Sequence, residues 1–353
     1  MESAYTFSDV MFKPQMSTVD SRVSVDLTTK LGNLTLTLPI VSANMADITE
    51  EKMAFQMQAH GGLGIIHRFM DIKDNVKMFE KTLGMMTNGA QWGSDNLGEG
   101  IPLEEACKYV GVSVGIGDNG KKRFEALYKA GARTFCIDVA HGHHTNVQKI
   151  LEWIRDNYNR KDLTIIAGNV ATREGASDLS RWGADVIKVG IGPGSCCKTR
   201  QNTGVGVPQL YAIEQARLGA PDVAIIADGG IKETGDIGKA IAVGADAVMV
   251  GGFLAGTTET PGHVYENMDG TFYKTMAGSA SAESKVRSGQ KNSFVEGGIR
   301  QVPFRGKVKY ILEKTKENIQ SAFSYNGARN VTELREKYEF ISLSGGGKKE
   351  SKY

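Results

Sequence analysis

The sequence has few of the features that mark secreted, membrane-spanning or nucleic-acid-binding proteins. It has only four cysteines in 353 residues, and their irregular spacing does not form a disulfide framework. Every apolar run is broken by Gly, Asp or Lys before it reaches the length of a membrane span. A net charge of +2 gives no electrostatic basis for a nucleic-acid or membrane partner. The N-terminus MESAYTFSDVMFKPQ has no signal-peptide pattern, so we expect a cytoplasmic protein with free thiols.

Glycine, in contrast, is abundant, with 43 residues, and many of them end short apolar runs. Eight such runs recur, each followed by an amphipathic helical pattern: 38–45, 61–67, 109–116, 134–140, 163–170, 186–192, 223–230 and 247–253. Near-continuous apolar runs of this length are typical of strands buried on both faces. Eight strand–helix units in about 220 residues predict a (β/α)8 TIM barrel. A doubly wound open sheet is the alternative.

Some segments do not fit the repeat. Residues 84–102 form a Gly- and Asn-rich excursion between the second and third units that is too short for a domain. Residues 254–305 form a long insertion after the eighth strand, and such a length without clear periodicity is typical of a functional lid or a disordered segment. We therefore predict a single domain over residues 1–343, with a short flap at about 274–301, and a disordered tail over 344–353.

Small and polar residues gather where the predicted strands end, which is where barrels of this kind carry their chemistry. Glycine-rich turns follow the sixth, seventh and eighth strands, at 190–195, 228–230 and 251–252. One such turn is most simply a tight connection, but three on adjacent units predict a phosphate site, because small residues let backbone N–H groups approach an anion. Asp228 closes an apolar strand, where its carboxylate either accepts hydrogen bonds from ribose hydroxyls or caps the next helix.

The adjacent residues Cys196 and Cys197 follow the first of these turns. In this position one side chain can face the end of the barrel while its neighbour packs into the protein. Cys197 lies two residues before Thr199 and three before Arg200, where a nearby cation and oriented N–H groups favour a thiolate. A thiolate attacks electron-poor carbon, such as C2 of a purine. We therefore predict that Cys197 is a nucleophile and that Cys196 is a buried packing residue.

The stretch VGIGPGSCCKTRQNTGVGVPQL resembles the catalytic-loop signature of the IMP dehydrogenase/GMP reductase family. Other family motifs follow in order from about residue 7 to 342, among them FSDVMFKP, GGLGIIHR, IDVAHGH, IADGGI and EGGIRQVPFRG. The chain departs from the family pattern at Cys196 and Lys198, where the family carries an apolar residue or Thr. The resemblance implies that Cys197 attacks C2 of a purine mononucleotide and that Thr199 and Glu296 relay a proton.

The resemblance also implies the binding residues, the cofactor and the assembly. The substrate would be bound by Ser195, Asp228, Gly229, Gly230, Gly251, Gly252, Gly278 and Ser279. Asp138 would face the nicotinamide ribose of NADPH, with His67 and Asn169 also on the cofactor side. A potassium ion would be held by the backbone carbonyls of Gly192, Gly194 and Cys197. The family further implies a homotetramer, whereas the expectation of no nucleic-acid or membrane partner rests on the net charge and the short apolar runs.

The family contains two activities that diverge after a shared covalent thioimidate. A dehydrogenase passes hydride from IMP to NAD and hydrolyses the adduct, for which the family uses an Arg-Tyr pair on a mobile flap. A reductase expels ammonia from GMP, accepts hydride from NADPH and must exclude water. The flap sequence here has no Tyr, no His and no Arg-Tyr pair, and the regulatory paired module usual between units two and three is missing.

We therefore favour a GMP reductase activity, the NADPH-dependent conversion of GMP to IMP and ammonia. An IMP dehydrogenase without the regulatory module is the alternative, and GGLGIIHR and IDVAHGH favour it. A purine-nucleotide-binding regulator without turnover is a second alternative.

Overall fold

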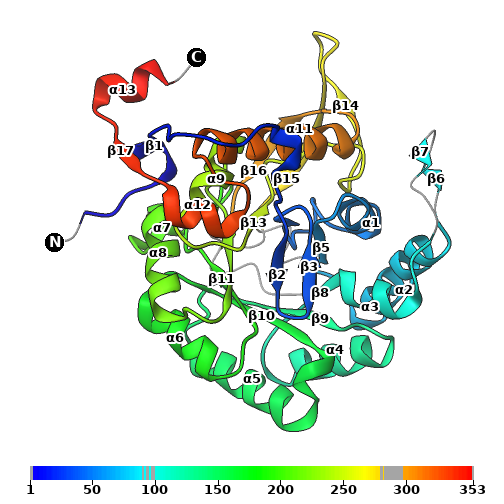
Figure 1. Ribbon diagram of the computed structural model, residues 1–353. Helices are drawn as coiled ribbons and strands as arrows, with labels where there is room; N and C mark the ends of the chain where they lie inside the picture. The colour runs from blue at the N-terminus through cyan, green and yellow to red at the C-terminus, as the bar shows by residue number, and fades with distance from the viewer. Residues whose placement is uncertain are drawn as a thin grey trace.

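The computed structural model describes residues 3–89, 91–92, 95–96, 100–278, 281 and 297–351. Its centre is a closed barrel of eight parallel strands (Figure 1). In order around the barrel these are β4 (Ile40–Ser42), β5 (Leu63–Ile66), β8 (Val110–Val114), β9 (Thr134–Asp138), β10 (Thr164–Val170), β11 (Val186–Val189), β12 (Ala224–Asp228) and β13 (Ala247–Val250). Each of the eight predicted runs contains one of these strands, and the (β/α)8 barrel is confirmed.

Helices follow the strands and surround the barrel (Figure 1). They are α1 (Glu51–Ala59), α2 (Ile72–Thr87), α3 (Leu103–Tyr109), α4 (Gly117–Lys129), α5 (Thr145–Asn157), α6 (Arg173–Arg181), α7 (Thr199–Thr203), α8 (Gln209–Gly219), α9 (Thr234–Ala242) and α11 (Val308–Tyr325). The Gly-Ala pairs after α4, α6 and α9 turn the chain back toward the next strand. Gly131, Gly183 and Gly244 have φ of 109°, 105° and 123°, a region that glycine adopts without the strain of a side chain.

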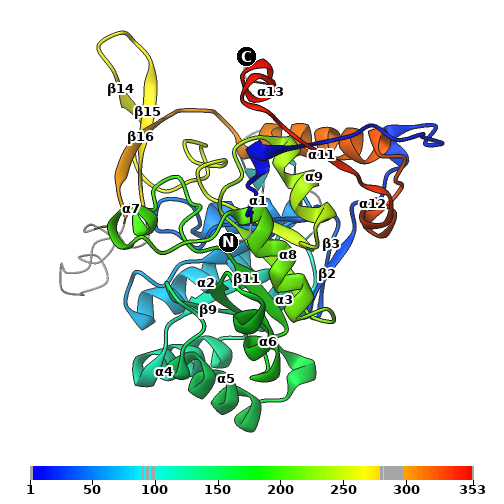
Figure 2. The same ribbon diagram turned by 90° about the vertical axis from the view of Figure 1, so that its left-hand side faces the viewer.

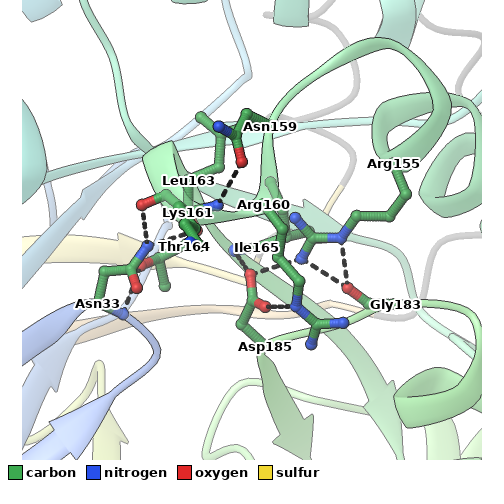
Figure 3. A network of polar contacts seen from close by, with 10 residues as sticks. All are labelled: Asn33, Arg155, Asn159, Arg160, Lys161, Leu163, Thr164, Ile165, Gly183 and Asp185. Carbon is green, nitrogen blue, oxygen red and sulfur yellow. Dashed lines mark hydrogen bonds and ion pairs between the residues drawn. The ribbon is translucent and has the colours of Figure 1, made fainter.

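A hairpin of β2 (Thr29–Leu31) and β3 (Leu34–Leu36) closes the end of the barrel where the strands begin, here called the floor. Leu31, Leu34 and Leu36 are at most 1% exposed and pack with side chains of the barrel interior. At the hairpin turn, the Asn33 amide donates to the carbonyls of Lys161 (3.0 Å) and Leu163 (2.9 Å), just before β10 (Figure 3).

Asp185 strengthens the floor beside this turn. Its carboxylate accepts hydrogen bonds from Arg155 Nη2 (2.5 Å), Arg160 Nε (3.0 Å) and the backbone N–H of Ile165 (2.8 Å), as Figure 3 shows. Arg155 also donates to the carbonyl of Gly183 from Nε (2.8 Å) and Nη2 (2.6 Å). The floor is therefore held by buried apolar contacts and by a network of hydrogen bonds and ion pairs around Asp185, as expected for the stabilising end of such a barrel.

The insertion after β13 forms a three-stranded antiparallel sheet of β14 (Tyr265–Glu266), β15 (Phe272–Ala277) and β16 (Ile299–Pro303). We call this sheet the arm, and it projects beyond the ring of helices (Figure 2). The predicted flap lies largely between β15 and β16, and its residues 279–280 and 282–296 are outside the described residues.

The two ends of the chain lie side by side, since β1 (Val10–Phe12) pairs with β17 (Phe340–Ser342). Helix α12 (Val331–Lys337) precedes this pair and α13 (Gly345–Glu350) follows it. Helix α13 differs from the disordered tail that the sequence predicts. Its N-cap Ser344 accepts from the N–H of Gly347 (3.2 Å), and Lys348 forms an ion pair with Asp9. These contacts give the polar tail partners that composition alone does not reveal.

Two smaller features complete the fold. Within residues 84–102, β6 (Gln91–Trp92) pairs with β7 (Asp95–Asn96). Three short 3-10 helices are η1 (Phe7–Asp9), η2 (Arg22–Ser24) and η3 (Arg160–Asp162). Among the described residues, no helix combines the length and apolar character needed to cross a membrane.

Candidate active site

The carboxyl ends of the barrel strands, here called the mouth, carry a network centred on Lys188 of β11. Its ammonium donates to Asp138 Oδ1 at the end of β9 and to Asp228 Oδ2 at the end of β12, each at 2.9 Å. It also donates to Asn169 Oδ1 on β10. The Asn169 amide nitrogen in turn donates to Asp228 Oδ2 and to the carbonyl of Gly190, each at 2.8 Å. The Lys188 cluster thus joins three of the residues that the sequence predicts for ligand contacts.

Lys188 itself was missed by the sequence reasoning, although a signal exists in the apolar run VIKVGIG. A lysine inside such a run must either break the strand or find partners, and this one is only 2% exposed. Burial by itself would lower the pKa of Lys188, but the carboxylates of Asp138 and Asp228 outweigh it and raise this pKa. Burial would raise the pKa of Asp138, but Lys188 and Arg68 outweigh it and lower this pKa. Lys188 and Asp138 are therefore charged at neutral pH.

His67, at the end of β5, contacts a different partner. Its ring is 3% exposed, its Nδ1 accepts from the N–H of Phe69 (3.1 Å), and its Nε2 lies 3.3 Å from Glu50 Oε1. Because Nδ1 accepts a hydrogen bond, the proton of the neutral ring sits on Nε2 and is donated to Glu50. Arg68, the next residue in the chain, donates to the carbonyl of Asp138 (3.3 Å). His67 itself hydrogen-bonds to Glu50 and Phe69 and, among the described residues, not to the side chains of the Lys188 cluster.

The cysteine loop follows β11 and ends at α7. The backbone N–H of Cys197 donates to the carbonyl of Gly194 (3.0 Å), which closes a tight turn. Cys197 is partly exposed, and its Sγ donates to Thr199 Oγ1 at 3.2 Å. Cys196 is 9% exposed and packs in an apolar cluster that includes Met276. Burial raises the pKa of Cys196, which keeps it a neutral thiol. The two adjacent sulfurs thus occupy different environments.

The arm reaches this loop. Cys197 and Gly297 form an antiparallel bridge, and the N–H of Gly298 donates to the carbonyl of Cys196 (2.9 Å). The N–H of Gly278 donates to the carbonyl of Gly298 (2.9 Å), which ties β15 to the same place. Two of the predicted residues, Glu296 and Ser279, lie outside the described residues. Glu296 directly precedes Gly297 in the chain.

The glycine turns after β11, β12 and β13 meet on one side of the mouth. A Cβ placed on Gly229 would lie 3.2 Å from the backbone nitrogen of Gly194, and one on Gly252 would lie 2.9 Å from Ser195 Oγ. Gly229 and Gly230 have φ of 87° and 83°, so a side chain there is strained as well as crowded. The structure therefore brings Ser195, Gly229 and Gly252, three of the predicted phosphate residues, close together at the mouth.

These features define a (β/α)8-barrel enzyme with a cysteine loop, a glycine-lined surface and a charged cluster at one end. A family model described as the IMP dehydrogenase/GMP reductase domain matches residues 4–353. The chain belongs to this family of nicotinamide-dependent oxidoreductases.

Similar proteins carry both of the family's names. An inosine-5′-monophosphate dehydrogenase of Aquifex aeolicus is 33% identical over 469 aligned positions, covering 99% of this chain and 95% of the relative. One of Borreliella burgdorferi is 36% identical over 392 positions, covering 99% and 96%. A cysteine-to-alanine variant of GMP reductase from Trypanosoma brucei, in complex with guanosine 5′-monophosphate, superposes with a TM-score of 0.90 at 28% identity, covering 100% of this chain and 98% of that chain.

Proposed function

We propose that this protein is a GMP reductase that converts GMP to IMP and ammonia with NADPH. The observation that carries the proposal is the combination of Cys197 hydrogen-bonded to Thr199 with a flap that holds no Tyr, His or Arg-Tyr pair to activate water. Hydrolysis of a thioimidate needs such a base, whereas expulsion of an amine needs a proton donor. In this proposal the hydroxyl of Thr199, which is partly buried beside Cys197, serves that purpose.

In this mechanism Cys197 Sγ forms a bond to C2 of GMP. The 2-amino group takes a proton through Thr199 and Glu296 and leaves as ammonia, which gives a thioimidate between Cys197 and the purine. NADPH, when bound, supplies the hydride that C2 then accepts. The C2–sulfur bond breaks, and the electron pair returns to Cys197 as IMP is released. Thr199 Oγ1 lies 3.2 Å from Cys197 Sγ, a distance that supports its proposed role as a proton donor to the group leaving C2.

The remaining mouth residues bind and orient the two ligands. Ser195, Gly229, Gly230, Gly251, Gly252, Gly278 and Ser279 surround the phosphate, and Asp228 accepts from the substrate ribose. Asp138, with Asn169 and His67, faces the cofactor. The Lys188 cluster supports this assignment, because its ammonium fixes both carboxylates with their remaining lone pairs available to hydroxyl donors.

A potassium ion fits the cysteine turn by its chemistry. Residues 190–197 offer backbone carbonyls and contain no Asp or Glu, which is a donor set suited to a monovalent cation. We propose the carbonyls of Gly192, Gly194 and Cys197 as its ligands. We further propose a cytoplasmic homotetramer.

IMP dehydrogenase is the second candidate, favoured by the curated relatives of 31–36% identity that carry this name. Steady-state assays with GMP plus NADPH, beside IMP plus NAD, separate the two. Turnover of GMP that is lost in Cys197→Ala supports the reductase. Turnover with IMP and NAD alone would overturn it, and nucleotide binding without turnover in either assay would favour a non-catalytic regulator.

A further inference from the structure

Arg300, on strand β16 of the arm, faces the glycine turn that follows β13. A Cβ placed on Gly252 would lie 3.8 Å from Arg300 Nη2 and 2.9 Å from Ser195 Oγ. The guanidinium and the hydroxyl thus approach one point above Gly252 from two different elements. Both Ser195 and Arg300 are exposed, so this point is open to solvent and to a ligand.

The register of the arm holds Arg300 on this side. Arg300 pairs directly with Met276 across β15 and β16, and residues opposite each other in an antiparallel pair project from the same face. Met276 is 2% exposed, and its Cε lies 3.7 Å from a Cβ placed on Gly251. The buried methionine therefore fixes the face of the arm that meets the glycine turn, and Arg300 lies on that face by register.

The charge of Arg300 is not neutralised by the protein residues that the structure describes. Asp47, the acidic residue near the cysteine loop, accepts from the N–H of Ala277 (2.7 Å) and forms no ion pair with Arg300 in the described part of the chain. Arg305, which follows β16, donates to the carbonyl of Phe253 (3.1 Å). A guanidinium left with free donors beside a hydroxyl and two glycines is suited to an anion with several oxygens.

We propose that Arg300 binds the phosphate of the purine mononucleotide, from the side opposite the glycine turn. The inference rests on the proposed function, which places that phosphate at Ser195, Gly251 and Gly252. Glycine at 252 leaves the space that a side chain would fill, the hydroxyl of Ser195 donates from one side, and the guanidinium donates from the other. Because Arg300 belongs to the arm, the phosphate also links the arm to the barrel.

Binding of IMP and inosine to Arg300→Gln tests this role. Both ligands are titrated calorimetrically without a nicotinamide cofactor, since IMP is then not converted in either reaction of the family. Loss of a charge-assisted contact to phosphate is expected to raise the Kd for IMP about 10- to 100-fold. Inosine lacks the phosphate, so its Kd should change less than about twofold. Arg300→Lys should bind IMP with an intermediate Kd, because it keeps the charge and loses the planar fork.

Two matched controls isolate the effect. Gln301→Ala alters the next residue of β16, whose side chain projects from the opposite face. Lys314→Gln removes the same charge from an exposed ion pair with Glu317 on α11. Both should leave the Kd for IMP unchanged. An unchanged Kd for IMP in Arg300→Gln, or an equal loss for IMP and inosine, would overturn the inference. Wild-type protein that binds neither IMP nor GMP would instead overturn the proposed function itself.

Discussion

Replacing Lys188 by methionine probes the centre of the mouth. The substitution keeps most of the side-chain volume and removes the ammonium that contacts Asp138, Asn169 and Asp228. Lys188 is 2% exposed and the two carboxylates are 16% and 23% exposed. Removing one partner of a buried ion pair costs about 3–5 kcal/mol. Because water reaches part of both carboxylates, we expect the lower end, about 3 kcal/mol of unfolding free energy.

The loss should depend on pH in a defined direction. In the wild type, Lys188 and Arg68 outweigh burial and lower the pKa of Asp138. The ionised Asp138 therefore stabilises the fold above its unfolded pKa of about 3.9, and this stability is lost as pH falls through the lower folded pKa. The raised pKa of Lys188 adds stability that is present at all pH values below about 10.4. Without the ammonium, Arg68 is the main group left to oppose burial, so the pKa of Asp138 should be higher in the variant than in the wild type and the folded variant should take up a proton at a higher pH. The difference in stability should therefore shrink as pH falls from 7.5 toward about 4.

Urea unfolding followed by tryptophan fluorescence and circular dichroism at both pH values measures this effect. Lys77→Met is the control, since it breaks an exposed ion pair with Asp74 and should change stability by at most about 0.5 kcal/mol. Adding Asp138→Asn to Lys188→Met should restore part of the loss by removing an unpaired charge. A loss below about 1 kcal/mol, or one equal at the two pH values, would refute the reasoning.

Three further predictions concern the loop and the glycine turn. Cys197→Ala should lower kcat with GMP and NADPH at least about 1,000-fold, whereas Cys196→Ala should stay within about threefold of wild type, and equal losses would contradict a single nucleophile. Glu296→Gln should slow ammonia release about 100-fold or more with a nearly unchanged Kd for GMP; a weakened Kd with an unchanged rate would make Glu296 a binding residue. Gly252→Ala places a Cβ 2.9 Å from Ser195 Oγ and should raise the Kd for GMP about tenfold without shifting the unfolding midpoint, which thermal denaturation and calorimetry can check together.

The barrel was predictable because each of its strands leaves a local mark in the sequence. A run such as LTIIAGNV is apolar on both faces and ends in small residues, which is the pattern of a strand covered by helices on one side and by the barrel interior on the other. The glycines that end α4, α6 and α9 are local marks too, since a left-handed residue is needed where each helix stops. The floor hairpin left a weaker mark, because its strands are only three residues long.

The contacts at the mouth were less predictable because they depend on register between distant strands. Lys188 lies 50 residues from Asp138 and 40 from Asp228 along the chain, and nothing local indicates that the three side chains meet. Arg300 depends in the same way on the pairing of β15 with β16, which places it opposite Met276. Helix α13 depends on Asp9 at the other end of the chain. Residue types and strand positions could be predicted from the sequence, whereas the contacts between distant side chains could be identified only in the folded barrel.

The floor hairpin has a consequence for the order in which ligands bind and leave. Leu31, Leu34 and Leu36 pack against the filled interior of the barrel at its floor, so the two ligands of the proposed function would both have to bind from the mouth. Of two ligands that share one face of the protein, the one bound closer to the barrel must bind first and leave last, so the proposed function predicts an ordered rather than a random kinetic mechanism.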